Sequence, residues 1–431
     1  MSLTPVWAWL PHQSEPVLAG ELEIGHGARF LYSKDYLASD AAVALDPVEL
    51  RLRRSARGIP IQAPDGLPGV IRDAMPAGYG ADRLRAVHGQ GLEPLQLLEL
   101  GVPDSVGAIE VCHDIEAKLK WRPKDLDDLK VLAEELDAAG PSSRTLRRLA
   151  DDLDTSAGGE RPKATLVHEG QLWLAKLQDR GDRAAMPARE YVTMKLAEEV
   201  GINAAPVRLF TFGSHQVLMV RRFDRSGDPM RPQRALFASA STLLRLPPAA
   251  ARGDPQRSYL LLQERLSTWA RVSPSGPSRL PEQIPELWRR VAFNAMVGNV
   301  DDHAGNTACI YTERDGEWAW ELSPAYDITP AATHIQAPLE EGPSLALSTG
   351  TDNLARTSIA RLMGLAERFG LDVGDARLWL RGAATTVANR WEGMLRDSAA
   401  PVIGEDAGVE SLIVSARPAF AYGEWLAQVL R

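Results

Sequence analysis

The stretch MVGNVDDHAGNTACIY, residues 296–311, places two carboxylates, one imidazole and two asparagines within eight positions. Polar runs of this density are usually turns. Apolar residues flank this run on both sides, so the sequence predicts a polar loop held between two buried elements. Within it, Asp301 and Asn306 stand five residues apart. The elements around the loop indicate what this spacing is for.

Upstream of the loop, the pattern predicts a small β-rich lobe and then helices. A Gly-rich turn is followed by two strands that meet at Glu169 and Gly170, by a helix that ends near Gly201, and by a hairpin that turns at Gly213 and Ser214. Beyond residue 256 the apolar residues mostly follow a helical period, with residues 273–285 expected to form a loop because they contain four prolines.

Downstream of the loop, the turn residues in TERDGEW, 312–318, predict a hairpin whose second strand leads to Asp327. The hairpin would bring Asp327 back to Asn306. Amphipathic helices are expected over 357–398 and 409–431.

The amino-terminal part reads differently. Short apolar pieces with Gly and Pro between them predict, over residues 1–112, strands and turns with one or two short helices. Residues 123–153 follow a helical period, as a connector of two helices would. We therefore expect an α+β fold with four parts, namely residues 1–115, a connector over 116–154, a small β-rich lobe over 155–228 and a helical lobe over 229–431.

Composition sets the outer limits. The 431 residues exceed the size at which one core usually divides, and the 45% hydrophobic and 24% charged shares are ordinary for a globular protein. Two cysteines without metal-ligand spacing, no long apolar run and no basic leader predict a cytoplasmic protein without a membrane segment. The net charge of −9 disfavours direct binding to nucleic acid.

The order of these elements indicates phosphoryl transfer. Asp301 and Asn306 have the separation of the base Asp and the metal-binding Asn in the protein-kinase catalytic loop. Lys176 lies in the apolar strand LWLAK, where a nucleotide phosphate and Glu190 of the next helix would satisfy its charge. The alternative is an edge-strand lysine that reaches solvent.

The remaining polar residues fit the same chemistry. Asp301 would orient or deprotonate the attacking hydroxyl, while Asn306 and Asp327 would hold Mg²⁺ through oxygen atoms. A lone Asp327 would otherwise be a helix cap or an Asx-turn. His303 is either a cofactor contact or an imidazole that holds the loop in shape.

The Gly-rich turn SAGGERPK, residues 156–163, matches neither the P-loop nor the complete dinucleotide fingerprint. Its backbone N–H groups, together with Arg161 and Lys163, could nevertheless cradle phosphates. An ordinary flexible turn is the alternative.

Taken together, TSAGGERPKA, LAK, ARE, VRRFDR, NVDDHAGN and SPAYDITP resemble, in order and spacing, the HipA-type serine/threonine kinases, which are toxins of bacterial toxin–antitoxin pairs. GLPGVIRDAMPAGYG and DSVGAIEV resemble the accessory domain of that family. The resemblance covers most of the chain and implies a protein-kinase-like fold that uses ATP and Mg²⁺. It implies that Lys176 contacts phosphate, that Asp301 is catalytic, and that Asn306 and Asp327 bind the metal.

The resemblance also implies further site residues. The hinge formed by Val220, Arg221 and Phe223 would hold adenine. Ser156 would be autophosphorylated within the nucleotide-binding loop that it forms with Ala157, Gly158 and Gly159, which would switch off ATP binding. The sequence departs from the family where Gln-Glu-Asp is expected, because it has Gln233, Arg234 and Ala235, and where Ala77 replaces a common Asp.

Three functions remain open at this point. The first is a protein kinase whose substrate, by resemblance, is an aminoacyl-tRNA synthetase, with a small helix-turn-helix antitoxin as partner and DNA contacted only through that partner. The second is a kinase for a small molecule or a lipid head group. The third is a non-catalytic subunit of a DNA-bound repressor complex.

Overall fold

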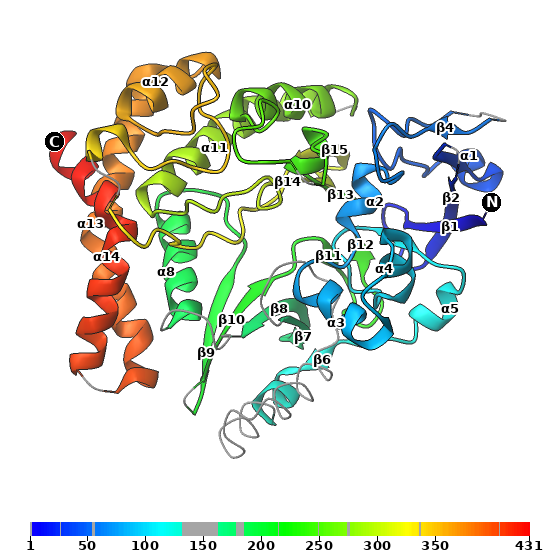
Figure 1. Ribbon diagram of the computed structural model, residues 1–431, viewed down its shortest axis with the longest axis horizontal. Coiled ribbons are helices and arrows are strands. Elements are labelled where there is room, and N and C mark those ends of the chain that lie inside the picture. The colour runs from blue at the N-terminus through cyan, green and yellow to red at the C-terminus, as the bar shows by residue number, and fades with distance from the viewer. Residues whose placement is uncertain are drawn as a thin grey trace. The chain divides into compact units, whose positions relative to one another are not determined.

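The computed structural model describes residues 2–25, 27–53, 57–131, 163–177, 185–213, 215–248, 250–273, 276–335, 338–404 and 406–431. Their contacts divide the chain into two compact units, each of which is described by itself (Figure 1). The first unit comprises Met1–Leu177, Arg221–Ala238 and Ile310–Gly316. The second unit comprises Gln178–Val220, Ser239–Cys309 and Glu317–Arg431.

The amino-terminal part of the first unit is built on a five-stranded sheet in the order β4-β3-β2-β1-β5. The strands are β1 (Ser2–Trp9), β2 (Pro16–Ile24), β3 (Arg29–Tyr32), β4 (Ile59–Pro60) and β5 (Ile109–Val111). All of their pairings are antiparallel, with an irregularity between Val6 and Trp7. Val6, Leu22 and Phe30 have no exposed surface, so the core lies on one face of this sheet.

This part contains more helix than the sequence predicts. Four short helices, rather than one or two, lie within the described part of residues 2–112, namely α1 (Lys34–Ala38), α2 (Gly69–Asp73), α3 (Tyr79–His88) and α4 (Pro94–Leu100). The Gly and Pro residues that indicate turns in the sequence instead flank or begin helices. Pro94 is the first residue of α4, and the side chains of Glu93 and Gln96 form a capping box there.

The rest of the first unit carries the predicted strands around Glu169 and Gly170. After α5 (Ile115–Lys118), β6 (Lys124–Asp125) pairs in parallel with β7 (Lys163–His168), which pairs antiparallel with β8 (Gln171–Leu177). Glu169 and Gly170 have φ of 50° and 69°, as a two-residue hairpin turn requires. Further along the chain, β11 (Arg225–Ser226) pairs with β12 (Gln233–Arg234). Most of the predicted connector helices lie outside the described residues.

The second unit is mainly helical. It begins with α8 (Met186–Glu199) and the hairpin of β9 (Val207–Phe212) and β10 (His215–Arg221), both as predicted. Its further helices are α9 (Ala240–Leu243), α10 (Tyr259–Arg271), α11 (Gly276–Met296), η1 (Leu339–Glu341), α12 (Ile359–Arg368), α13 (Val373–Ile403) and α14 (Asp406–Val429). The long helices α13 and α14 run side by side (Figure 1), and the rings of Trp391 and Phe420 stack between them at 4.4 Å.

Three strands lie in the segments where the chain passes between the two units, namely β13 (Phe237–Ser239), β14 (Ala308–Arg314) and β15 (Glu317–Leu322). The turn between β14 and β15 is the predicted one, because Asp315 and Gly316 have φ of 57° and 79°. After β15 the chain continues to Asp327 without regular structure.

The predicted loop over 273–285 is wrong for most of its length, because α11 begins at Gly276 and contains Pro281 and Pro285. Each proline removes one helical hydrogen bond. Contacts with β15 compensate for this loss. Buried Arg279 forms an ion pair with Glu321 at 3.0 Å, and the side-chain oxygen of Gln283 accepts from the Leu322 N–H at 2.9 Å.

Among the described residues, no helix combines the length and the apolar character that crossing a membrane requires.

Candidate active site

The loop over 299–306 is held at the end of α11. Gly298 has φ of +59°, and a Cβ atom there would lie 2.6 Å from the Ala419 carbonyl oxygen, so only glycine allows the chain to leave the helix at this point. The Asn299 N–H donates to the Asn294 carbonyl at 2.8 Å. The Gly298 carbonyl accepts from the N–H groups of Ala331 and Ala332, both at 3.0 Å. The start of the loop is therefore fixed.

The two adjacent carboxylates of the loop lie in opposite environments. Asp302 is buried and accepts hydrogen bonds from the Tyr259 hydroxyl and, at 2.7 Å, from the Ala346 N–H. Burial raises the pKa of Asp302 well above its usual value, although the hydrogen bond from Ala346 opposes this shift. Asp301 is exposed. Asp302 therefore anchors the loop and leaves Asp301 accessible to a substrate.

His303 takes part in the shape of the loop. Its ring Nδ1 accepts from the Gly305 N–H at 3.2 Å, and its own backbone N–H donates to the Asp301 carbonyl at 2.7 Å. These bonds fit the structural alternative for His303. A contact of this ring with a nucleotide stays a prediction.

Asn306 is oriented by the loop in a way that suits a metal ligand. Its side-chain Nδ2 donates to the Asp301 carbonyl at 3.2 Å, and its backbone N–H donates to the His303 carbonyl at 2.8 Å. Because the NH₂ group is used within the loop, the side-chain oxygen is the atom that Asn306 can offer to a cation.

The segment that carries Asp327 is fastened to this loop within the second unit. The Tyr326 hydroxyl donates to the Gly305 carbonyl at 2.7 Å, and Ala325 exchanges backbone hydrogen bonds with Asn203 and Ala205. Asp327 itself is half-buried and has φ of +58°, a left-handed conformation that is uncommon for residues other than glycine. These bonds fix the backbone that leads into Asp327, and the bond of Tyr326 ties it to Gly305, the residue that precedes Asn306.

The donor atoms of this region fit Mg²⁺. An amide oxygen from Asn306 and a carboxylate from Asp327 are hard oxygen ligands, and Mg²⁺ is commonly held by one or two carboxylates together with substrate phosphates and water. The residues that the structure describes contain no group of three or more His, Cys, Asp or Glu side chains that could hold a metal ion without such help. A metal at Asn306 and Asp327 would thus depend on a phosphate ligand.

Two lysines meet in the first unit. Lys163 of β7 and Lys176 of β8 are direct partners in the antiparallel register, so their side chains lie on the same face of the sheet. Both are only 7% exposed. The sequence predicts a phosphate contact for each lysine separately, and the strand register places the two lysines opposite each other on one face of the sheet.

Comparison with known proteins settles the family. The profile of the HipA-like C-terminal domain matches residues 155–391, which is more than half of the chain and includes every candidate residue named above. The chain belongs to the HipA-like family.

Two solved structures resemble this HipA-like chain. HipA from Shewanella oneidensis MR-1, in a structure of a toxin–antitoxin system with HipB and operator DNA, has a TM-score of 0.64 at 18% identity, over 99% of this chain and 98% of that chain. This likeness shows the fold alone and confirms the expected fold class. The proinflammatory kinase CtkA from Helicobacter pylori is less similar, with a TM-score of 0.41 and 13% identity over 63% of this chain and 93% of that chain.

The other predicted site residues of the HipA-like chain lie as follows. Glu190 is buried on α8. Val220 is buried near the end of β10 opposite Val207, Arg221 is exposed and Phe223 is half-buried. Their contacts with a nucleotide stay predictions. Ser156, Ala157, Gly158 and Gly159 lie outside the described residues.

Sequence reasoning missed the buried charged residues within and directly after this hinge, namely Arg222, Asp224 and Arg225. Asp224 accepts from Arg222 at 2.8 Å, from Arg225 at 2.7 Å and from the Gly107 N–H at 2.8 Å, and Arg222 also pairs with Asp104 at 2.6 Å. The arginine charges hold the pKa of Asp224 far below its usual value against the effect of burial. The dense charges of RRFDR, directly after an apolar strand, were the available signal.

Proposed function

We propose that the protein is an ATP- and Mg²⁺-dependent serine/threonine protein kinase of HipA type that acts as the toxin of a toxin–antitoxin pair. The observation that carries the proposal is the catalytic loop of the second unit. An accessible Asp301, an Asn306 side chain whose NH₂ group is bonded within the loop, and a fastened Asp327 segment support a base and metal ligands for phosphoryl transfer.

In this proposal each residue has one task. Asp301 orients the attacking hydroxyl and accepts its proton, which needs an accessible carboxylate beside a rigid backbone. Lys163 and Lys176 balance the charge of the nucleotide phosphates, because two ammonium groups on one sheet face favour an anion. Asn306 and Asp327 hold Mg²⁺, which neutralises charge on the phosphates when bound. Glu190 orients Lys176, and Val220, Arg221 and Phe223 contact adenine.

The proposal extends to partners by similarity. The similar Shewanella protein was solved with HipB and operator DNA, so we propose a small helix-turn-helix antitoxin for this chain and contact with DNA through that antitoxin. The net charge of −9 supports an indirect contact with DNA. The substrate class is a cytoplasmic protein such as an aminoacyl-tRNA synthetase, and its phosphorylation arrests growth.

Transfer of labelled γ-phosphate from ATP to a bacterial lysate tests the kinase assignment. A labelled protein band in the presence of the wild type, and none with Asp301→Ala, is the expected result. Label found in a small molecule or a lipid would instead assign the protein as a small-molecule or lipid head-group kinase. Absence of any label, with purified protein that binds its antitoxin, would leave a non-catalytic repressor subunit.

The proposal includes autophosphorylation of Ser156 as an off-switch. A phosphate there adds about −1.5 to −2 charges beside the nucleotide phosphates, which repels ATP and favours an open loop. Mass spectrometry after incubation with Mg–ATP should find phosphate on Ser156, and the phosphorylated form should bind ATP more weakly. Equal ATP affinity of the two forms would remove the switch.

A further inference from the structure

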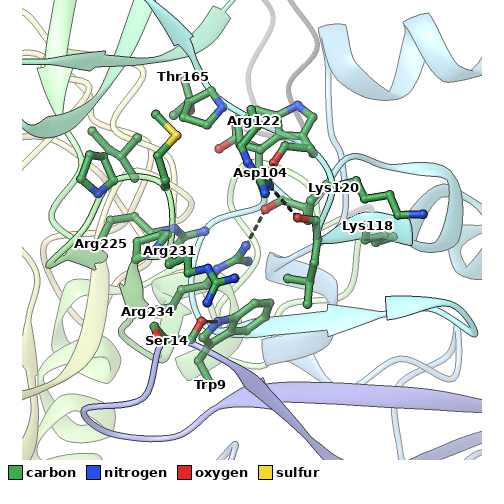
Figure 2. Close-up of a pocket in the computed structure, with 18 of the residues that line it drawn as sticks. Trp9, Ser14, Asp104, Lys118, Lys120, Arg122, Thr165, Arg225, Arg231 and Arg234 are labelled. Carbon is green, nitrogen blue, oxygen red and sulfur yellow. Dashed lines mark hydrogen bonds between the residues drawn. The ribbon is translucent and has the colours of Figure 1, made fainter. Parts of the chain in front are cut away.

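The first unit contains a basic cavity of about 270 Å³ that the proposed kinase chemistry does not use. Six cationic side chains line it, from Lys118, Lys120, Arg122, Arg225, Arg231 and Arg234. Among the described residues, Glu15, Asp104 and Glu116 also line it, and Glu110 and Asp224 pair with Lys118 and Arg225 behind the wall. Figure 2 shows Arg225, Arg231 and Arg234 on one side of this cavity and Lys118 and Lys120 on the other. Such an excess of cations is unusual in a chain of net charge −9.

Arg234 is the central observation. Its side chain is 7% exposed, and its Nη2 donates to the Pro103 carbonyl at 2.7 Å. The guanidinium lies 3.6 Å from the centroid of the Trp9 ring, which fixes its plane. Its Nε and Nη1 are buried and make no hydrogen bond within the described part of the chain, although Nη1 lies 3.5 Å from a Glu110 oxygen. Buried guanidinium donors without an acceptor are costly, so a ligand acceptor is expected.

The electrostatics of the surrounding walls favour an anion. Burial and the neighbouring charge of Arg222 lower the pKa of Arg225 well below its usual value. Burial also lowers the pKa of Arg234, and Glu110 compensates only in part. Both pKa shifts mean that the charged forms of Arg225 and Arg234 are less favourable at these buried positions than in water. An anion in the cavity would reverse this effect, because an opposite charge stabilises the ionised form.

One of the cavity residues, Arg234, stands where the sequence departs from the pattern that the family resemblance predicts. Where Gln-Glu-Asp is expected, the chain has Gln233, Arg234 and Ala235. A guanidinium therefore replaces the expected Glu carboxylate, and a methyl group replaces the expected Asp carboxylate. Two exposed side chains, Arg231 and Lys120, supply further donors at the mouth of the cavity. Arg231 lies 3.4 Å from Glu15, and both of these side chains are mostly in solvent.

We propose that this cavity binds a phosphomonoester dianion, either as a free small phosphate or as a phosphorylated side chain. The cationic side chains of the lining favour an anion, although Asp224 pairs with Arg225 at 2.7 Å and Glu110 pairs with Lys118 at 3.0 Å. Planar guanidinium groups match the geometry of phosphate oxygens. A space of this volume admits one phosphate group with a small substituent. Its lining residues all belong to the first unit, whereas Asp301, Asn306 and Asp327 belong to the second.

Calorimetric titration of the full-length protein tests the site with inorganic phosphate, O-phosphoserine and a phosphoserine peptide, and with serine as an uncharged control. We expect saturable one-site binding with a Kd below about 1 mM. Tighter binding of O-phosphoserine or the peptide than of inorganic phosphate identifies a phosphorylated side chain as the ligand. The opposite order identifies a free phosphate.

Two variants locate the site. Arg234→Met keeps the apolar contact with Trp9 and removes the charge, and we expect the affinity to fall about 10-fold or more. Arg231→Gln changes an exposed side chain, so its fold should be unaffected, and a smaller loss is expected. Arg377→Gln, on the exposed face of α13, is the matched control and should bind as the wild type does. The proposal is overturned by a wild type without saturable binding, or by wild-type affinity in both Arg234→Met and Arg231→Gln.

Discussion

The loop over 299–306 and the segment RRFDR over 221–225 both contain adjacent charged residues, yet the two stretches hold these charges differently. In RRFDR, Arg222, Asp224 and Arg225 are all buried and bonded to one another and to backbone carbonyls. In the loop, Asp302 is buried while the adjacent Asp301 is exposed. A charged side chain that satisfies its neighbours stabilises the fold, whereas one left in solvent beside a fixed backbone is available for chemistry.

The strongest test of this difference is Asp301→Ala. We expect phosphotransfer to fall by about 10³-fold or more, because the carboxylate acts on the reacting hydroxyl. The midpoint of urea unfolding should stay near that of the wild type, since the side chain is exposed. Single-turnover assays with labelled ATP measure the first quantity. Activity near the wild-type level would end the assignment of Asp301 as the base.

Asp224→Ala should have the converse effect. It leaves Arg222 and Arg225 buried without their shared carboxylate, and removing one partner of a buried ion pair costs about 3–5 kcal/mol of unfolding free energy. Urea denaturation measures this loss, with Asp352→Asn as the control, because Asp352 pairs with Arg361 at the surface. Equal stability of the two variants would mean that the buried cluster contributes little.

Because the pKa of Asp224 is low, the contribution of this buried cluster to the unfolding free energy should depend on pH. A carboxyl whose pKa is depressed in the folded state contributes stability above its unfolded pKa of about 4, and this contribution is lost as the pH falls further. The wild type should therefore lose stability below about pH 4 more steeply than Asp224→Ala does. Parallel curves would contradict the assignment.

Asp327→Asn should weaken Mg²⁺-dependent ATP binding by at least about 10-fold. Mutation of residues that only hydrogen-bond to metal ligands already lowers metal affinity by about this factor. The cause is the removal of the single carboxylate in the proposed ligand pair. Titrations with ATP in the presence and absence of Mg²⁺ separate the metal contribution. Glu340→Gln, at an exposed site near η1, is a control for lost charge. An unchanged metal dependence would make Asp327 a structural residue.

Asp302→Asn tests the buried member of the loop. Because the pKa of Asp302 is raised, the folded protein retains this proton above the unfolded pKa of about 4, so the wild type loses stability as the pH rises. Relative to Asp302→Asn, its unfolding free energy should fall by up to ~1.4 kcal/mol per pH unit. Denaturation at pH 5 and pH 8 measures this. A constant difference would show that Asp302 does not titrate there.

The sequence predicted the elements whose signals are local. The turns at Glu169 and Gly170 and at Asp315 and Gly316 follow from residues that tolerate positive φ. Helix α8 follows from its apolar spacing and the glycine after it. The site residues Asp301, Asn306 and Asp327 were identified by order and spacing. The spacing to Asn306 selected Asp301, but nothing local indicated that Asp302 would be buried, because its partners Tyr259 and Ala346 are distant in sequence.

The sequence by itself thus determined which residues are proposed for the chemistry and which segments turn, because side-chain type and backbone preference act over a few residues. The tertiary structure alone decided the course of α11 through Pro281 and Pro285, which depends on the contacts of Arg279 and Gln283 with β15. It also decided the burial of Asp302 and the position of Arg234 over Trp9. Burial and charge depend on neighbours that are distant in sequence, and only the folded chain brings those neighbours together.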